Sequence, residues 1–277
     1  MPKSIAAIPA LAACLWASEA MAEPLFPNSV VSNDIEFIAA DDPAVFGCLR
    51  TLGQATQEMP GALDTDELMV EGVHTFAVAF ADDTEVGVWV HPSVGTQADA
   101  EAVAALLVGP IGRLPAVMRR TLSHVVIHSG DHTAFGEHLG HFFVVYADNV
   151  RARIATHDLE ETVFHEAVHA TLDAAWAQSE EWRQAQAADG AFITEYAAAD
   201  PEGEDLAESA LFAYAHLRHP DRLPPEVARG VEAIMPARLA FFERLFAAPE
   251  PDVAGAERLA GVGCASAHHS APGPLVR

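Results

Sequence analysis

Short apolar stretches separated by polar turns run through the first half of the chain, and this pattern is typical of β-strands. Stretches rich in β-branched and aromatic residues predict strands at 73–80, 85–90, 122–128, 141–146 and 151–156. The turn Ala81-Asp-Asp-Thr84 joins the first two of these strands and therefore predicts a β-hairpin. We expect the last strand, which is short, to lie at an edge of the sheet.

Helical spacing dominates the second half of the chain. Residues 157–189 contain no Pro or Gly and are rich in Ala, Leu, Glu and Gln, so they predict a long helix. Asp158 is followed three residues later by Glu161, which predicts a capping box at the start of this helix.

Three further segments show apolar residues at helical spacing. Residues 42–57 predict a short amphipathic helix, and residues 97–121 predict one or two helices. Residues 225–247 predict a core-facing helix that is broken at Pro236. Because most of the strands come first and most of the helices follow, the pattern indicates an α+β domain.

The N-terminus has the features of a secretory signal peptide. A basic residue precedes the apolar run Ile5–Ala17, and Ala20-Met-Ala22 supplies an A-x-A site, so we expect export and cleavage after Ala22. The apolar run is too short to span a bilayer as a permanent helix, which predicts no stable membrane insertion. Leu11-Ala-Ala-Cys14 also resembles a lipoprotein box with a lipid on the cysteine, but the signal would then be unusually short, which favours the Ala22 site.

These features divide the chain into three parts. Residues 1–22 form the signal peptide, and residues 23–250 form one domain, with the strands in 23–157 and the helices in 158–250. Residues 251–277 are rich in Gly, Ala and Pro and predict a loose C-terminal tail.

Charge and cysteine content narrow the possible partners and compartment. The net charge of −25 excludes electrostatic binding to nucleic acid or to anionic membranes. Export to the periplasm or the medium would place Cys48 and Cys264 in an oxidising space, which predicts a disulfide between the N-terminal region and the tail. Two buried free thiols are the alternative.

The candidate chemistry lies in the segment His165-Glu166-Ala-Val-His169, which matches the H-E-x-x-H signature of zinc peptidases. Residues four apart share one helix face, so the imidazoles of His165 and His169 can converge on one metal ion. Glu166 lies about 100° round the helix from His165 and can reach a water on that ion. The motif therefore predicts Zn²⁺ as cofactor, two histidine ligands and Glu166 as general base.

A zinc site of this type needs a third protein ligand. Asp200-Pro201 predicts the start of a helix in which Glu204 and Glu208 share a face. Like charges placed four residues apart repel mildly on a bare helix, and a bound cation offsets that cost. The chain between His169 and Glu204 is long enough for the first helix to end and for the chain to return.

The segment Glu204-Asp-Leu-Ala-Glu208, with Tyr196 upstream and Asp173 four residues after the second histidine, resembles the gluzincin metallopeptidases. More narrowly, it is similar to the catalytic domain of anthrax lethal factor and compact bacterial relatives. The resemblance covers roughly residues 140–220 and rests on the H-E-x-x-H motif combined with the downstream glutamates. It implies a zincin-like fold, in which a small mixed sheet and the active-site helix form an upper lobe over a helical lower lobe.

The same resemblance assigns roles to residues outside the motif. It implies that Glu204 is the third zinc ligand, that Asp173 and Glu208 orient the imidazoles, and that Tyr196 donates a hydrogen bond to the oxyanion. Glu202 is the rival ligand, although it lacks the Ala-Glu sequence that follows Glu204. Tyr196 has a second interpretation, as a side chain packed in a turn between helices.

The motif and the resemblance together predict an exported zinc metallopeptidase that acts on peptides or proteins. An edge strand at 151–156 would hold the substrate extended beside the zinc. Two alternatives stay open. One is a zinc hydrolase of a non-protein amide, such as a cell-wall peptide link, which would use the same residues. The other is a non-catalytic binding protein that keeps the fold.

Overall fold

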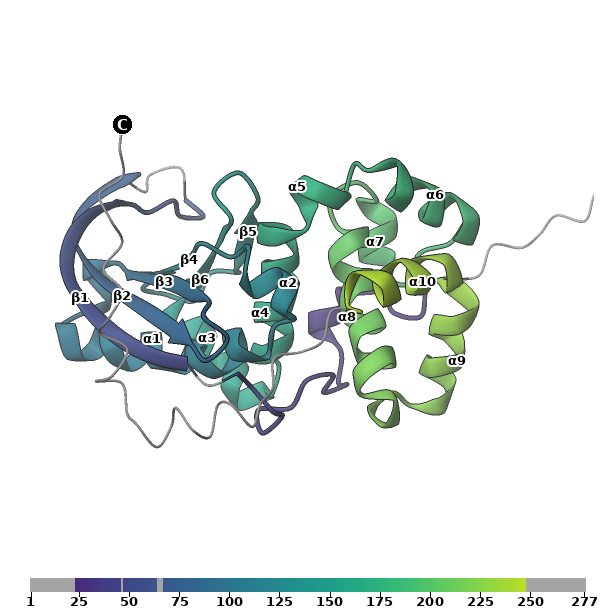
Figure 1. Ribbon diagram of the computed structural model, residues 1–277, viewed down its shortest axis with the longest axis horizontal. Helices are drawn as coiled ribbons and strands as arrows, with labels where there is room; N and C mark the ends of the chain where they lie inside the picture. Colours follow the sequence, from purple (N-terminus) through teal and green to yellow (C-terminus); the bar gives the residue numbers. More distant parts are fainter. Residues whose placement is uncertain (1–22, 46, 64–66, 248–277) are drawn as a thin grey trace, which may run out of the picture.

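The computed structural model describes residues 23–45, 47–63 and 67–247, which form a half built on a β-sheet and an all-helical half (Figure 1). Helix α4 (Leu159–Thr171) belongs to the sheet half and contacts helix α8 (Asp205–Arg218) of the helical half. The architecture is mixed α and β, as the sequence pattern predicts. None of the helices in these ranges is both long enough and apolar enough to cross a membrane.

One mixed sheet of six strands forms the first half in the described ranges. Its strands are β1 (Gly47–Glu58), β2 (Met69–Phe80), β3 (Glu85–Val90), β4 (His124–His128), β5 (Phe135–Glu137) and β6 (Phe142–Tyr146). They lie in the order β1-β2-β3-β4-β6-β5, where β4 pairs in parallel with β3 and β6 and the other pairs are antiparallel. The predicted hairpin and the two predicted strands after it are confirmed, and β5 forms one edge of the sheet.

Two predicted elements are wrong. Residues 42–57 predict a helix, but β1 occupies most of this segment because it pairs along nearly its whole length with β2. Residues 151–156 predict an edge strand, but they belong to helix α3 (Ala147–Thr156), which buries Ala147 and Val150.

All but one of the remaining helices lie in segments that the sequence predicts as helical, apart from internal breaks, and the exception is α7 (Glu195–Ala199), which was not predicted. They are α1 (Gln97–Arg113), α2 (Ala116–Arg119), α5 (Asp173–Trp176), α6 (Glu180–Asp189), α7 (Glu195–Ala199), α9 (Pro225–Ile234) and α10 (Pro236–Leu245), with 3-10 turns η1 (Val30–Ser32), η2 (Pro92–Val94) and η3 (Pro220–Arg222). The single helix predicted for 157–189 is divided into α4, α5 and α6, and Ser179 caps α6 by accepting a hydrogen bond from the backbone N–H of Trp182. The predicted break at Pro236 is confirmed.

The predicted capping box at the start of α4 is also wrong, although the helix does begin after Asp158. The Asp158 carboxylate accepts hydrogen bonds from Arg153 and Thr156 instead of from the backbone of α4. The Glu161 carboxylate accepts a hydrogen bond from the backbone N–H of Ile38, 3.0 Å away. Asp158 is therefore engaged by residues at the end of α3, and Glu161 by a distant residue, instead of by the local cap.

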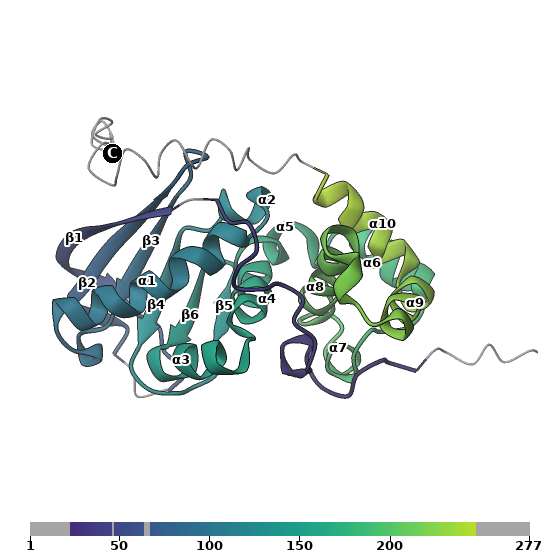
Figure 2. The ribbon, with the colours of Figure 1, turned by 90° about the horizontal axis from the view of Figure 1, so that it is seen from below.

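Alternation along the central strands places the main core on one face of the sheet. Val125 and Ile127 of β4 pack with helices α1 and α4, whereas Val126 belongs to a smaller apolar cluster on the opposite face. α1 and α4 lie side by side on the core face, and Figure 2 shows them in front of the strands. This packing fixes α4 between the sheet and the helical half.

Residues 24–45, here called the N-terminal strap, run along the border between the two halves (Figure 2). The strap contacts the helical half where the backbone N–H of Leu25 donates to the carbonyl of Ile193, 3.0 Å away. It contacts the sheet half where Ile38 reaches Glu161 and where Val45 bonds the carbonyl of Gly112.

Several predictions concern residues outside the described ranges. Cys48 is buried in β1, but Cys264 lies beyond residue 247, so the disulfide stays a prediction. The signal peptide at 1–22, the lipid on Cys14 and the loose tail at 251–277 also lie outside the described residues.

Candidate metal centre

The H-E-x-x-H segment lies in α4, where the helix forms one wall of a cavity of about 1010 Å³. His165, Glu166 and His169 line this cavity, as the spacing of the motif predicts. The other walls come from β5 and the residues around it, from the N-terminal strap, from α5 and from the segment that leads into α8. The cavity thus lies between the two halves of the protein.

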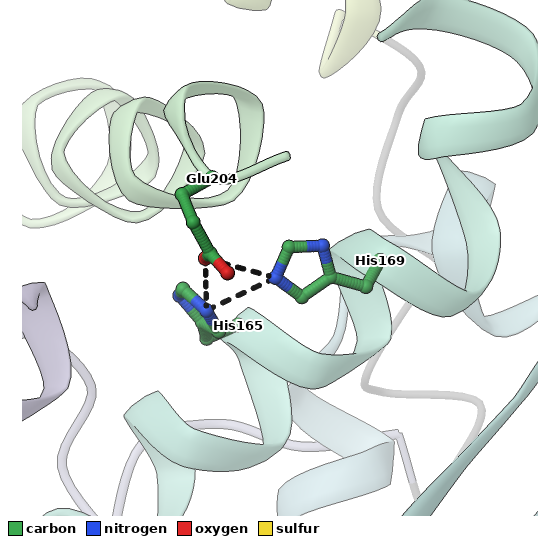
Figure 3. A group of neighbouring side chains, drawn as sticks. All are labelled: His165, His169 and Glu204. Carbon is green, nitrogen blue, oxygen red and sulfur yellow. Dashed lines mark hydrogen bonds and ion pairs between the residues drawn. The ribbon is translucent and has the colours of Figure 1, made fainter. Parts of the chain in front are cut away.

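Three side chains converge in this cavity (Figure 3). Nε2 of His165 lies 3.1 Å from Nε2 of His169, and Oε2 of Glu204 lies 3.4 Å and 3.3 Å from these two nitrogen atoms. Glu202, the rival ligand, also lines the cavity but does not belong to this group of ligand atoms. The fold therefore brings Glu204 to the two histidines.

The donor atoms suit a tetrahedral metal ion. Bonds of about 2.0–2.1 Å at tetrahedral angles separate neighbouring donor atoms by roughly 3.3 Å, which is close to each side of the observed triangle. Within the described residues, Oε2 of Glu204 is buried and accepts no hydrogen bond. Two imidazole nitrogens and one carboxylate oxygen are also a ligand set that Zn²⁺ commonly takes. The residues present fit this ion.

Asp173 fixes the orientation of His169. Its Oδ2 lies 2.8 Å from Nδ1 of His169, so the proton of a neutral imidazole is held on Nδ1 and Nε2 presents its lone pair to the cavity. Burial lowers the pKa of His169, but the contacts with Asp173 and Glu204 outweigh it and raise the pKa to about 10. The site therefore attracts positive charge, either protons or a metal ion that displaces them.

A buried network holds the segment that carries Glu204. The Arg238 guanidinium bonds the carboxylates of Asp189 and Asp205, and Asp205 is the first residue of α8.

The sequence predicts a helix from Asp200-Pro201 onwards, but these residues form a turn and the helix begins one residue after Glu204. Burial raises the pKa of Glu204, but the His165 and His169 imidazoles outweigh it and lower the pKa well below its usual value.

Tyr196 lies at the open side of the cavity. It is 42% exposed, and its hydroxyl donates a hydrogen bond to Oε1 of Glu204 over 3.1 Å. Burial and the Glu204 carboxylate raise the pKa of Tyr196 to about 12, so the hydroxyl keeps its proton and can donate it to an oxygen in the cavity. Tyr196 therefore lies beside the converging side chains, half exposed, and is not packed away in a turn between helices.

Glu166 lies beside the histidines and is largely buried. Burial raises the pKa of its carboxyl group, and the positive charge of His165 and His169 opposes this effect. A carboxylate whose pKa is raised is a stronger base than one in free solution. Glu166 therefore presents a carboxyl group to the cavity beside the two histidines.

The edge strand β5 is a part of the site that sequence patterns missed. It has three residues, Phe135–Glu137, which is too short for a periodic signal. Gly136 contacts α4 so closely that a Cβ atom there would lie 2.5 Å from Cβ of His169 and 2.6 Å from the carbonyl oxygen of Glu166. In the sequence, Gly136 was the available clue to this strand, since an isolated glycine in a strand often marks a place where another backbone approaches closely.

We expect Gly136→Ala to force β5 away from α4, because a Cβ there would meet Cβ of His169 and two backbone atoms of α4, none of which can move without the helix. Overpacking of this kind costs about 1–3 kcal/mol, and thermal unfolding of the variant should show it. Metal affinity should fall as well, since the added methyl group would push against Cβ of His169 and shift its imidazole. Gly109→Ala is the matched control, because its Cβ would meet only the flexible end of Arg113. Equal stability of the two variants would contradict the proposed contact.

The chain matches no protein-family model, no curated protein and no solved structure. We therefore infer its function from the residues that the fold brings together. These are three converging side chains that could hold a metal ion, the Glu166 carboxyl group beside them and a cavity bordered by an edge strand.

Proposed function

We propose that the protein is a zinc-dependent metallopeptidase with a zincin-like arrangement, in which His165, His169 and Glu204 hold the ion. The observation that carries this proposal is the triangle of donor atoms with sides of 3.1–3.4 Å. The positions of His165 and His169 follow from helical spacing, but Glu204 belongs to a segment in the other half of the protein. A chance spacing of two histidines on a helix does not explain why the Glu204 carboxylate lies beside both of them.

The chemistry follows from the residues around the triangle. Bound there, Zn²⁺ would supply Lewis acidity, which polarises a carbonyl group and lowers the pKa of a ligated water. Glu166 accepts the proton of the attacking water and passes it to the leaving amine. The Tyr196 hydroxyl, at the open side of the cavity, donates a hydrogen bond to the oxyanion of the substrate.

The edge strand β5 suits an extended peptide substrate, and it replaces the strand predicted at 151–156. β5 pairs with β6 on one side, so its other side offers backbone groups to a peptide. Phe135 and Gly136 line the same cavity as the zinc-binding residues. A peptide added to this edge therefore lies beside the Glu166 carboxylate.

Metal content and hydrolysis test this proposal together. Elemental analysis of the purified protein should give about one zinc per chain. A peptide library should be cleaved, cleavage should stop with a chelator, and it should return when Zn²⁺ is restored. Zinc absent after refolding with the metal would contradict the metal centre. A protein that holds zinc but cleaves only cell-wall amides, or nothing, would contradict the peptidase activity.

A further inference from the structure

The N-terminal strap reaches the metal centre through one buried carboxylate, that of Glu208. This residue lies one turn of α8 after Glu204 and is 0% exposed. Its Oε1 accepts a hydrogen bond from the Ser29 hydroxyl over 2.6 Å. Its Oε2 accepts bonds from the backbone N–H of Val30 over 2.8 Å and from the Thr194 hydroxyl over 2.9 Å. Two of these three donors belong to the strap.

The same carboxylate faces a ligand of the proposed zinc site. Oε1 of Glu208 lies 3.5 Å from Nδ1 of His165. That nitrogen is buried and, in the described part of the chain, forms no hydrogen bond. When Nε2 of His165 presents its lone pair to the cavity, the proton of the neutral ring is on Nδ1. Glu208 is then placed to accept it, as Asp173 does for His169.

Several elements hold the donors of Glu208 in place. Phe26 of the strap forms a bridge with Thr194, and the hydroxyl of Thr194 also caps α7, which carries Tyr196. Val30 is buried, and the strap is attached to α4 through Ile38. The Glu208 carboxylate cannot rotate without the loss of contacts to the strap, to α7 or to His165.

We propose that Ser29 and Val30 are positioning residues of the metal centre, which hold Glu208 and through it set the orientation of His165. The docked strap is then a requirement for tight metal binding. This inference rests on the proposed function, because it assumes that His165 binds the ion. Outer residues that orient a histidine ligand commonly change metal affinity about 10–100-fold.

Metal affinity of the full chain tests this proposal. Ser29→Ala removes the hydroxyl donor and should weaken Zn²⁺ binding about tenfold in a chelator competition. The visible absorption of the Co²⁺-loaded variant should differ from that of the wild type, since the ligand field depends on the imidazole orientation. Ser29→Thr keeps a hydroxyl and should restore both properties. Ser32→Ala is the matched control, because Ser32 lies on the same strap and lines the same cavity but is not one of the three hydrogen-bond donors to Glu208 described above.

A second variant separates positioning from general folding. Val30→Pro removes the backbone N–H donor, and Ser29 already has φ −54° and ψ 148°, a conformation that suits the residue before a proline. It too should weaken metal binding, while thermal unfolding without metal reports any loss of fold. If Ser29→Ala and Val30→Pro both bind Zn²⁺ and Co²⁺ as the wild type does, the strap has no positioning role, while the proposed metal site is retained. If the wild type itself binds neither ion, both this inference and the proposed function are overturned.

Discussion

Glu166→Gln is expected to remove most of the peptide hydrolysis and to leave the metal centre intact. Glutamine keeps the shape of the side chain but cannot accept the proton of the attacking water at neutral pH. Loss of a general base typically costs about 10²–10⁴-fold in rate, so kcat/KM should fall within this range. Zinc content should stay near that of the wild type, because Glu166 is not one of the three converging ligand residues.

The control for this experiment lies on the same helix. Glu160 is also a buried glutamate of α4, but it pairs with Arg113 and does not line the cavity. Glu160→Gln therefore tests whether the loss of a buried carboxylate from α4 is enough to reduce activity. A Glu166→Gln enzyme that retains wild-type kcat/KM would exclude Glu166 as the general base.

Glu204→Ala is expected to remove the third ligand and with it tight zinc binding. The loss of affinity should exceed the roughly 10–100-fold that the loss of an outer orienting residue causes. Isothermal titration of the metal-free protein with Zn²⁺ measures this difference. The Tyr196 hydroxyl also loses its partner, so its pKa should move back towards that of a free tyrosine.

Glu202→Ala is the matched control for Glu204→Ala. Glu202 lies two residues earlier in the same turn and lines the same cavity, but its carboxylate does not converge with the histidines. We expect its metal affinity to equal that of the wild type. The reverse result, with affinity lost in Glu202→Ala and kept in Glu204→Ala, would show that the turn before α8 rearranges when the metal binds.

Features that depend on neighbouring residues could be predicted from the sequence. The convergence of His165 and His169 depends only on the helical repeat, and the break between α9 and α10 follows from Pro236. The β2–β3 hairpin follows from two β-rich stretches joined by a short turn. Each of these features depends on residues a few positions apart.

Elements whose structure depends on distant partners were predicted poorly. Residues 42–57 have apolar spacing that suits a helix, but pairing with β2 makes most of them part of strand β1. Asp158 and Glu161 have the spacing of a capping box, but Asp158 bonds Arg153 at the end of α3 and Glu161 bonds the distant backbone N–H of Ile38. In each case, contacts made on folding outweigh a local preference of a few tenths to about 1 kcal/mol.

The sequence by itself indicated which residues of α4 could bind a metal and act as a base, because helical spacing puts His165 and His169 on one face and Glu166 next to that face. The resemblance favoured Glu204 over Glu202, but its meeting with the histidines depends on how α8 packs against α4, which only the tertiary structure shows. The tertiary structure also decided that β5 borders the site and that Ser29 bonds Glu208, which is 179 residues away in the chain. Such contacts leave no periodic trace in the sequence, because they form only when packing of the core brings the two halves together.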